Sequence, residues 1–418
     1  MVLSSTGTHW IMHCLTAIAD MGQTPRFMVL GAGTYQVPLI QAAKKRGFHV
    51  VVASIPGNYP GIKIADSFIE VDTTDVDKIV SAALDYHIEG IATTGSDVCV
   101  PSIGAVIDRM DLPGTGYEAS ILSMDKSEMK ERFQKRGVPT ASFQHCRDLE
   151  EALEAAKSIG YPVAVKAVDS SGSRGISKVD ESSEMELAVS NVMSITHSER
   201  FLVEEWLVGT EFGAQAIVSG GRVVDFILHN DTTTDPPVVV PIGHSVPFNH
   251  VDLREDAFSA IQSAVEALGI DQTVANVDLM LTANGIQILE IGARMGGTCL
   301  PELCSLITGT DFYELVIRLA SGENMESPLN RVNGAWAALL IQSPRDGELR
   351  PMIEPDTSNR HELITWALDY PEGGVVSRFV TGNHRIGHII VESEKPQIAE
   401  EIASELHTLA IDSLEWVE

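Results

Sequence analysis

The first part of the chain alternates short apolar runs with segments of helical spacing. An apolar run at residues 27–30 leads into a Gly31-Ala-Gly33 turn, and apolar positions then recur at helical intervals over residues 37–46. The alternation continues with strand-like runs at residues 50–54, 67–71 and 90–94 and a helix-like segment at residues 76–86. Strands that alternate with helices are typical of a parallel sheet. We therefore predict an open, Rossmann-like α/β domain over about residues 26–118.

The pattern resumes after a helix-rich stretch over residues 117–136. It predicts helices at residues 148–159, from about 181, and at 255–268, with strands at 163–167, 201–205, 274–282 and 287–291. The last segment, residues 331–418, holds two further strand-like runs and an amphipathic helix over residues 397–408. No long linker separates these units, so we predict three α/β lobes that pack together.

The Gly31-Ala-Gly33 turn matches a dinucleotide-binding loop only in part. The third glycine of that motif would stand at position 36, which is Gln36, and Ser54 stands where an acid would close the second strand. A tight strand-to-helix turn is favoured. A phosphate or carboxylate at the helix N-terminus is the alternative.

Charge and composition exclude several classes of protein. The chain has 29 Lys and Arg against 58 Asp and Glu, a net charge of −29, which repels nucleic acids and acidic membranes. No run approaches about eighteen apolar residues, so no transmembrane helix is predicted. Residues 1–25 lack the Lys or Arg of a secretory signal and are expected to form a disordered leader. Five widely spaced cysteines indicate reduced thiols and a cytoplasmic protein.

Lys166 and the loop that follows it are candidates for phosphate binding. Lys166 lies within an apolar strand, where an unpaired ammonium is costly, so we expect it to face solvent or to hold an anion. The Ser170-Ser-Gly-Ser-Arg-Gly175 loop offers backbone N–H groups and the charge of Arg174, which suit nucleotide phosphates. The alternative is an ordinary surface loop, since no Walker motif is present.

Acidic residues gather at another strand end. Glu204 and Glu205 end an apolar strand, and Glu211 follows a glycine two residues later. Acids at such a point can accept hydrogen bonds from an adenine amino group and from ribose hydroxyls. The alternative is a strand end whose charges are solvated.

Asp278 and Glu290 flank a predicted hairpin at Asn284-Gly285. A two-residue Asn-Gly loop would place the two acids on opposite faces, whereas a three-residue loop, residues 283–285, would place them directly opposite on one face. A carboxylate within an apolar strand rarely stays unpaired. Facing carboxylates repel unless a cation lies between them, and Mg²⁺ binds carboxylates together with substrate phosphates.

Taken in order, these segments resemble the ATP-grasp superfamily from about residue 26 onward. The matching signature is Asp125-Lys126 with Gly137-Val-Pro139, Lys166 with Gly172-Ser-Arg-Gly175, Glu204-Glu-Trp-Leu207 with Gly209-Thr-Glu211, and Asp278 and Glu290 with Arg294-Met-Gly-Gly297. It is most similar to the group with biotin carboxylase, carbamoyl-phosphate synthetase, glycinamide ribonucleotide synthetase and L-amino-acid ligases. The resemblance implies a pre-ATP-grasp domain, then an ATP-grasp domain over residues 119–330 with a lid at about 138–207. A C-terminal lobe, residues 331–418, would complete the ATP-grasp region.

The resemblance also implies a role for each matching residue. Nucleotide phosphate would be bound by Lys126 and by Lys166, which is also expected to be catalytic. The lid loop would consist of Ser173, Arg174 and Gly175. Adenine would be held by Glu204, Glu205, Trp206 and Leu207, and ribose by Glu211. Mg²⁺ or Mn²⁺ would be bound by Asp278 and Glu290, and Arg294 would stabilise an acyl phosphate during catalysis.

Enzymes of this superfamily activate a carboxylate with the γ-phosphoryl group of ATP. The resemblance therefore implies an ADP-forming ligase that joins a small carboxylate, with an amino acid as the first expectation, to an amine. One alternative is a carboxylase or purine-pathway type of enzyme that phosphorylates bicarbonate or formate, and another is an ATP-binding protein without catalysis. The expected partners are small molecules, with a homodimer as the default assembly.

Three positions near the predicted site carry separate expectations. The superfamily commonly has Asn two residues after the second metal-binding acid, where this chain has Gly292, so water or substrate would complete the metal site. His244 lies in a segment that would face the acceptor, and a structural role is favoured for it. Cys299 is expected to line the acceptor pocket without acting as a nucleophile.

Overall fold

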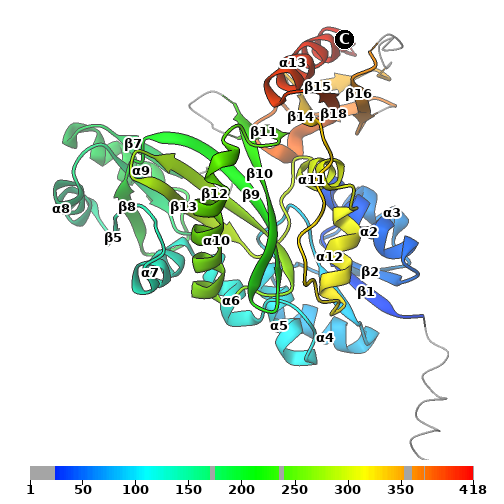
Figure 1. The fold of residues 1–418 in the computed structure, drawn as a ribbon, viewed down its shortest axis with the longest axis horizontal. Helices are drawn as coiled ribbons and strands as arrows, with labels where there is room; N and C mark the ends of the chain where they lie inside the picture. Colours follow the sequence, from blue (N-terminus) through cyan, green and yellow to red (C-terminus); the bar gives the residue numbers. More distant parts are fainter. Residues whose placement is uncertain (1–23, 170–174, 235–239, 353–359, 371, 418) are drawn as a thin grey trace, which may run out of the picture.

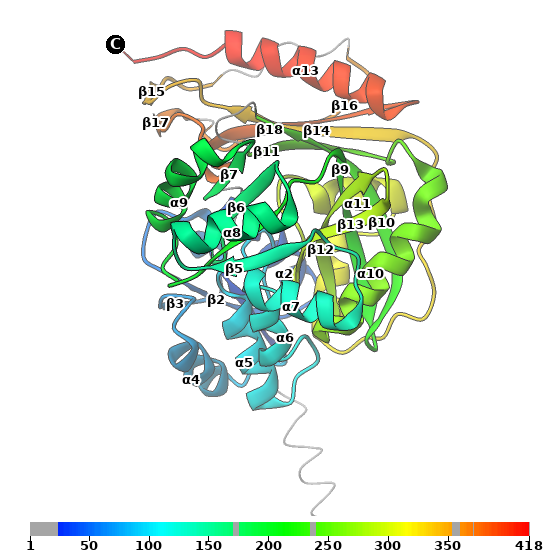
Figure 2. The same ribbon diagram turned by 90° about the vertical axis from the view of Figure 1, so that its left-hand side faces the viewer.

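The computed structural model describes residues 24–169, 175–234, 240–352, 360–370 and 372–417. Most of the predicted leader therefore lies outside the described residues. A central sheet of long strands separates the N-terminal domain from a smaller α/β unit, and the C-terminal helix lies above both (Figures 1 and 2). The predicted α/β class is confirmed.

The N-terminal domain is a four-stranded parallel sheet in the order β3-β2-β1-β4. Its strands are β1 (Arg26–Leu30), β2 (His49–Ser54), β3 (Ser67–Glu70) and β4 (Gly90–Ala92). Its helices are α2 (Val37–Lys45), α3 (Pro60–Ile64), α4 (Val76–Tyr86) and α5 (Val100–Met110). The apolar runs of β1 and β2 are buried on both faces, as expected for a sheet that helices cover on both sides.

The Gly31-Ala-Gly33 segment is a tight turn whose polar groups are already used. The Gln36 side chain is buried, its Oε1 accepts from Gly33 N–H at 2.9 Å, and its Nε2 donates to the carbonyl of Thr94. Gln36 therefore fills the space that a dinucleotide would need, which agrees with the interpretation as a strand-to-helix turn.

The second unit has an antiparallel sheet in the order β5-β8-β6-β7. Two helices, α6 (Tyr117–Leu122) and α7 (Lys126–Arg136), lead into it, and α8 (Leu149–Ile159) and α9 (Met185–Met193) pack on the sheet. The strands are β5 (Phe143–Cys146), β6 (Val163–Ala167), β7 (Ile176–Val179) and β8 (Phe201–Glu205). This unit covers the residues of the predicted lid, about 138–207, and its role as a lid stays a prediction.

The large sheet has eight strands in the order β13-β12-β9-β10-β11-β14-β18-β16. Its first five strands in the chain are β9 (Gly209–Ser219), β10 (Arg222–Thr233), β11 (Pro241–Val246), β12 (Thr273–Thr282) and β13 (Gly285–Gly292). The helices that follow or cover it are α10 (Arg254–Leu268), α11 (Leu300–Thr308) and α12 (Phe312–Ala320). Helix α12 also packs against α2 and β4, which attaches the large sheet to the N-terminal domain.

The tail continues the same sheet. The strands β14 (Ala335–Gln342), β16 (Leu363–Leu368) and β18 (Arg385–Ser393) extend it from β11, and α13 (Pro396–Asp412) covers β14 and β18 (Figure 2). A separate pair is formed by β15 (Gly347–Leu349) and β17 (Gly374–Val376). The prediction of two strands here was wrong, since the described residues of the tail form five. Two of these have only three residues, which is too short to show an alternating pattern, and one of the three longer strands was also missed.

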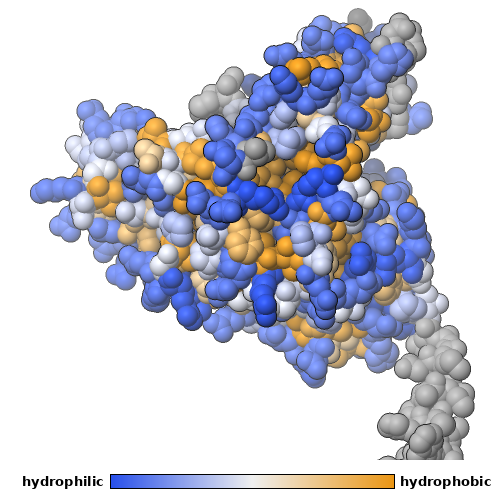
Figure 3. Space-filling model, viewed as in Figure 1, coloured by the Kyte–Doolittle hydropathy of each residue, from blue (hydrophilic) through white to orange (hydrophobic). Residues whose placement is uncertain are grey.

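The surface in Figure 3 is mostly hydrophilic, with hydrophobic residues in patches between the charged ones. None of the described helices is long and apolar enough to cross a membrane. The described cysteines Cys99, Cys146, Cys299 and Cys304 are free thiols and buried, in agreement with the expectation of reduced cysteines.

Candidate active site

Two lysines share the buried carboxylate of Glu204. Lys166 on β6 forms an ion pair with Oε1 of Glu204 on the adjacent strand β8, and Lys130 on α7 lies 3.0 Å from Oε2. Burial would raise the pKa of Glu204, but the two ammonium groups outweigh it and lower that pKa to about 2. Both oxygens are thus engaged by lysines. Glu204 holds Lys166 in place. A contact between the Glu204 side chain and adenine would have to displace one of the two lysines.

Lys126 connects the start of α7 to the large sheet. Asp125 caps the helix by accepting from Ser127 N–H at 2.8 Å, and the Lys126 ammonium lies 2.7 Å from Oε2 of Glu290 on β13. Burial lowers the pKa of Lys126, but Glu290 and the acids near it outweigh that effect and raise it. Lys126 therefore stays charged beside the predicted metal-binding acids.

Asp278 and Glu290 are directly opposite each other on β12 and β13, as predicted. Neither of the two loops considered, 284–285 and 283–285, is present, because Thr282 pairs with Gly285 and the loop consists of residues 283 and 284. Leu279 pairs with Ile288, so one extra residue, Leu289, bulges out of β13 and restores the facing register. Sequence patterns do not specify such a bulge.

At Asp278, the effect of the neighbouring acids outweighs that of the cation Arg294. Burial, followed by the carboxylates of Glu290, Asp231 and Glu211, raises the pKa of Asp278 to about 8, while Arg294 lowers it less. A group of carboxylate oxygens with an excess of negative charge matches the donor set that Mg²⁺ prefers. The residues present therefore fit a divalent cation between Asp278 and Glu290.

Asp97 is a residue of this site that the sequence analysis missed. It lies in the loop after β4, which is held against the segment after β13 by a hydrogen bond from Gly95 N–H to the carbonyl of Met295 at 3.0 Å. Arg294 Nη2 lies 2.5 Å from Asp97 Oδ1. A Cβ built on Gly292 would lie 3.3 Å from the same oxygen. The Asp97 carboxylate therefore lies beside the position where the superfamily commonly has an Asn side chain.

A signal for Asp97 was present in the sequence. Asp97 comes shortly after the apolar strand β4, and Glu204 and Glu205 likewise lie at the end of an apolar strand. Strand β4 is parallel to its neighbour β1 in the sheet. Side chains after parallel strands gather at one edge of the sheet, where sites commonly form.

A buried cluster of two histidines and Asp231 lies beside the acids. Asp231 Oδ1 accepts from His229 Nδ1 at 2.7 Å and from His244 Nδ1 at 2.6 Å. Burial would raise the pKa of Asp231, but the two histidines hold it well below its usual range. Gly213 on β9 lies opposite both His229 and Asp278, and its missing side chain leaves room for the His229 ring.

This cluster is connected to Asp278 through two amides. Gln215 Oε1 accepts from Gly296 N–H at 2.9 Å, and its Nε2 donates to Asn276 Oδ1 at 2.6 Å and lies 3.3 Å from His229 Nε2. Asn276 Nδ2 donates to Asp278 Oδ1 at 3.0 Å. The Gly296 contact fixes Oε1 as the acceptor, so His229 accepts at Nε2 and carries its proton on Nδ1. Although these ligand types suit a metal, His229 Nδ1 is occupied by its hydrogen bond to Asp231.

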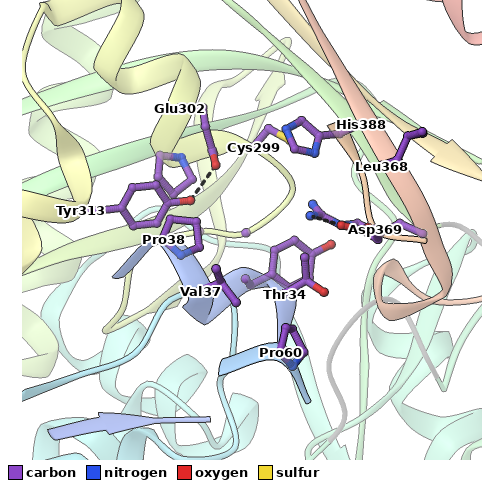
Figure 4. A pocket seen from close by; sticks show the side chains of 15 residues that line it. Thr34, Val37, Pro38, Pro60, Cys299, Glu302, Tyr313, Leu368, Asp369 and His388 are labelled. Atoms are coloured by element: carbon purple, nitrogen blue, oxygen red, sulfur yellow. Dashed lines mark hydrogen bonds and ion pairs between the residues drawn. The ribbon is translucent and has the colours of Figure 1, made fainter. Parts of the chain in front are cut away.

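A cavity of about 320 Å³ adjoins the segment after Arg294 (Figure 4). It lies between the N-terminal domain, which contributes Tyr35, the Gly296-Gly297 turn, and the C-terminal strands, which contribute Arg385. Glu302 and Tyr313, from α11 and α12, lie close together at its wall in Figure 4, and Tyr313 donates to Glu302 Oε1 at 2.7 Å. Cys299 lines this cavity. That the cavity receives the acceptor stays a prediction, and the groups around Cys299 could not be identified from the sequence.

The remaining predicted residues are placed as follows. Ser173 and Arg174 lie outside the described residues, and Gly175 accepts at its carbonyl from Ala167 N–H at 2.9 Å. Glu205 is exposed at the end of β8, followed by half-buried Trp206 and Leu207. Glu211 lies on β9 opposite Met280, one pleat along from Asp278.

Comparisons with known proteins find similar sequences and similar structures. Residues 123–298 match the ATP-grasp domain family. A D-alanine–D-alanine ligase from Pelobacter propionicus is 32% identical over 243 residues, which cover 54% of this chain and 74% of that enzyme. A phosphoribosylglycinamide synthetase from Anaerococcus prevotii superposes with a TM-score of 0.79 at 29% identity, covering 94% of this chain and all of that chain. An L-amino acid ligase from Bacillus licheniformis has a TM-score of 0.75 at 19% identity, with 95% and 99% covered.

Proposed function

Since this chain belongs to the ATP-grasp family of ATP-dependent, ADP-forming ligases, we propose that it activates a small carboxylate, an amino acid, as an acyl phosphate and transfers it to an amine. The observation that carries this proposal is the facing pair Asp278 and Glu290 with Arg294 nearby and a cavity lined by Gly296 and Gly297, which follow Arg294 in the chain. The relatives named above that join amino acids or glycine derivatives support a carboxylate–amine reaction.

ATP would bind where the small antiparallel sheet meets the large sheet. Lys126 and Lys166 would contact its phosphates, and each forms an ion pair with a carboxylate, Lys126 with Glu290 and Lys166 with Glu204. The segment 205–207, with Glu205 exposed and Trp206 and Leu207 half-buried, would receive the adenine, and Glu211 the ribose. Ser173, Arg174 and Gly175 would close over the phosphates.

A magnesium ion would be held by Asp278 and Glu290. It would neutralise charge on the ATP phosphates and thereby favour transfer of the γ-phosphoryl group. Held there, the ion would add positive charge beside Asp278, and Lys126, now paired with Glu290, would contact a phosphate instead.

The chemistry requires positioning more than a reactive side chain. A carboxylate oxygen of the substrate attacks the γ-phosphorus, the bond to the β-phosphate oxygen breaks, and ADP leaves. A neutral amine then attacks the acyl carbon, inorganic phosphate leaves, and the amine proton is released. Arg294, held by Asp97, would stabilise the charge on the acyl phosphate and on the tetrahedral intermediate.

The test is ADP release with a panel of carboxylic acids, amino acids and amines in the presence of MgATP. Lys166→Ala and Glu290→Ala are each expected to lower turnover by at least about 100-fold, because each removes a group that acts on the transferring phosphoryl charge. Lys157→Ala, an exposed position on α8, is the matched control and should be unaffected. If both site variants retained wild-type turnover, the assignment would be wrong.

The same panel decides between the alternatives. ATP hydrolysis that depends on bicarbonate or formate alone would favour an enzyme of the carboxylase or purine-pathway type. Tight binding of MgATP without turnover of any acid would indicate a protein without catalysis. The cavity beside Gly296 favours the amino-acid ligase, because its volume of about 320 Å³ and its several polar groups exceed what bicarbonate requires.

A further inference from the structure

The charges that line the cavity beside Gly296 do not cancel. Arg385 donates to Asp369 through Nε at 2.8 Å and through Nη2 at 3.2 Å, so this pair is neutral overall. Burial and the Arg385 charge lower the pKa of His388 to about 4, and burial raises the pKa of Cys299, so both are neutral near pH 7. The carboxylate of Glu302 is left without a counter-charge among the described residues that line this cavity.

The geometry of Glu302 is that of a binding group. Oε1 accepts the Tyr313 hydroxyl at 2.7 Å, whereas Oε2 is buried and accepts no hydrogen bond from another described residue. Burial raises the pKa of Glu302 more than Tyr313 and Arg385 lower it. A buried carboxylate oxygen without a donor costs free energy, which a cationic ligand would recover.

The neighbours of Glu302 keep it in one position. Glu302 lies in the first turn of α11, and Tyr313 lies in the first turn of α12, which packs against α11. The backbone of Thr298 and Cys299, between Gly297 and α11, is left-handed at φ 50° and 64°. Such strain in two consecutive non-glycine residues is found at functional sites, and here it joins the Gly296-Gly297 turn to the helix that carries Glu302.

From these observations we propose that Glu302, oriented by Tyr313, binds an ammonium group of the substrate whose carboxylate is phosphorylated beside Arg294. The substrate class is then an amino acid, and the corresponding acid without the amino group is excluded. This inference rests on the proposed function and adds the group that selects its substrate. A substrate ammonium held in this way keeps its proton and does not act as the nucleophile, which therefore comes from the second substrate.

The experiment compares acids that differ only by an amino group. The pairs are glycine and acetate, L-alanine and propionate, and 4-aminobutanoate and butanoate, each tested for MgATP-dependent ADP release and for binding to the protein with MgADP by calorimetry. In the wild-type chain the amino member of at least one pair is expected to have a kcat/KM at least tenfold higher than its partner. Glu302→Gln should remove that preference while the KM for ATP stays unchanged, and Tyr313→Phe should reduce it in part.

Controls separate selection from folding and from the reaction itself. Glu401→Gln, an exposed acid on α13, should keep the wild-type preference, and thermal unfolding should show that each variant is folded. If ADP is released equally with both members of every pair, or if Glu302→Gln keeps the preference, the inference is overturned and the proposed ligase function stands. If the protein binds only the amino acids but releases no ADP with any acid, the inference stands and the proposed function fails. Absence of both binding and turnover overturns both.

Discussion

Asp97 and Arg294 form an ion pair of 2.5 Å between two different parts of the fold, the loop after β4 and the segment after β13. Burial would raise the pKa of Asp97, but Arg294 outweighs it and keeps the carboxylate ionised. The pair fixes the direction of the guanidinium, which is the group proposed to act on the acyl phosphate. The N-terminal domain thus takes part in the site without contributing a phosphate-binding loop.

Asp97→Asn is expected to lower kcat by about 10- to 100-fold, the usual effect of removing a partner that orients a catalytic group. The dissociation constant of MgATP should hardly change, because the ion pair of Asp97 is with Arg294, which is not among the residues proposed to hold the nucleotide. Steady-state kinetics and calorimetry would measure the two quantities. Asp85→Asn, at an exposed position of α4, is the control, and an unchanged kcat in Asp97→Asn would contradict the role.

Glu204→Gln is expected to destabilise the fold by about 3–5 kcal/mol at pH 7, because it leaves Lys130 and Lys166 without their buried counter-charge. Urea unfolding would measure this change. Replacing the exposed Glu154 by Gln should have little effect.

The same carboxylate predicts a pH dependence. The pKa of Glu204 is lowered from 4.5 to about 2 in the folded state, so its stabilisation is complete above pH 4.5 and is lost as the pH falls toward 2. The stability difference between wild type and Glu204→Gln should therefore shrink on acidification through this window. A difference that is constant from pH 6 to pH 3 would argue against an ionised Glu204.

His388 should make the stability of the folded chain depend on pH, in contrast to a surface histidine whose pKa is the same in the folded and unfolded chain. Its pKa is lowered from 6.5 to about 4, so the unfolded chain binds more protons than the folded chain between these values. Stability due to His388 is then complete above pH 6.5 and falls on acidification to pH 4, by at most about 1.4 kcal/mol per pH unit. In His388→Gln this component should disappear, which unfolding curves at pH 4.5 and pH 7.5 would show. Equal pH dependence in both proteins would contradict a buried, neutral His388.

Gly213→Ala is expected to cost about 1–3 kcal/mol, since a Cβ there would collide with the His229 ring. The ring cannot move without breaking its hydrogen bonds to Asp231 and Gln215, so turnover should fall as well. The double variant with His229→Ala should lose less stability than the sum of the two single variants. Additive losses would show that the collision is relieved elsewhere.

Much of the fold was predictable because its signals are local. The apolar spacing over residues 76–86 predicts a helix that is present as α4, and residues 397–408 lie within α13. The order of the motifs likewise identified the ATP-grasp family. The hairpin was less accessible, since Gly285, at φ 98°, begins β13 instead of closing the loop, and the bulge at Leu289 then compensates.

The groups that sequence reasoning missed depend on tertiary contacts. Asp97 and Arg294 meet only because the N-terminal domain docks on the end of β13, and Arg385 reaches the cavity only through the pairing of β14 with β18. The sequence analysis considered His244 without its partner Asp231. The two residues lie opposite each other in the pairing of β10 with β11, and the register of that pairing cannot be read from either strand alone.

The pairing of β11 with β14 makes the proposed nucleotide half and the proposed substrate half of the molecule two ends of one hydrogen-bonded sheet. The strands that carry the acids proposed to act on ATP come first in the chain, and the strand that carries Arg385 and His388 comes last. Changes in the last strands can therefore alter which acid is accepted without disturbing phosphoryl transfer. A chain cut before β14 would keep every motif by which the family is recognised and yet lose a wall of its substrate cavity, so its ATP chemistry would have no defined acceptor.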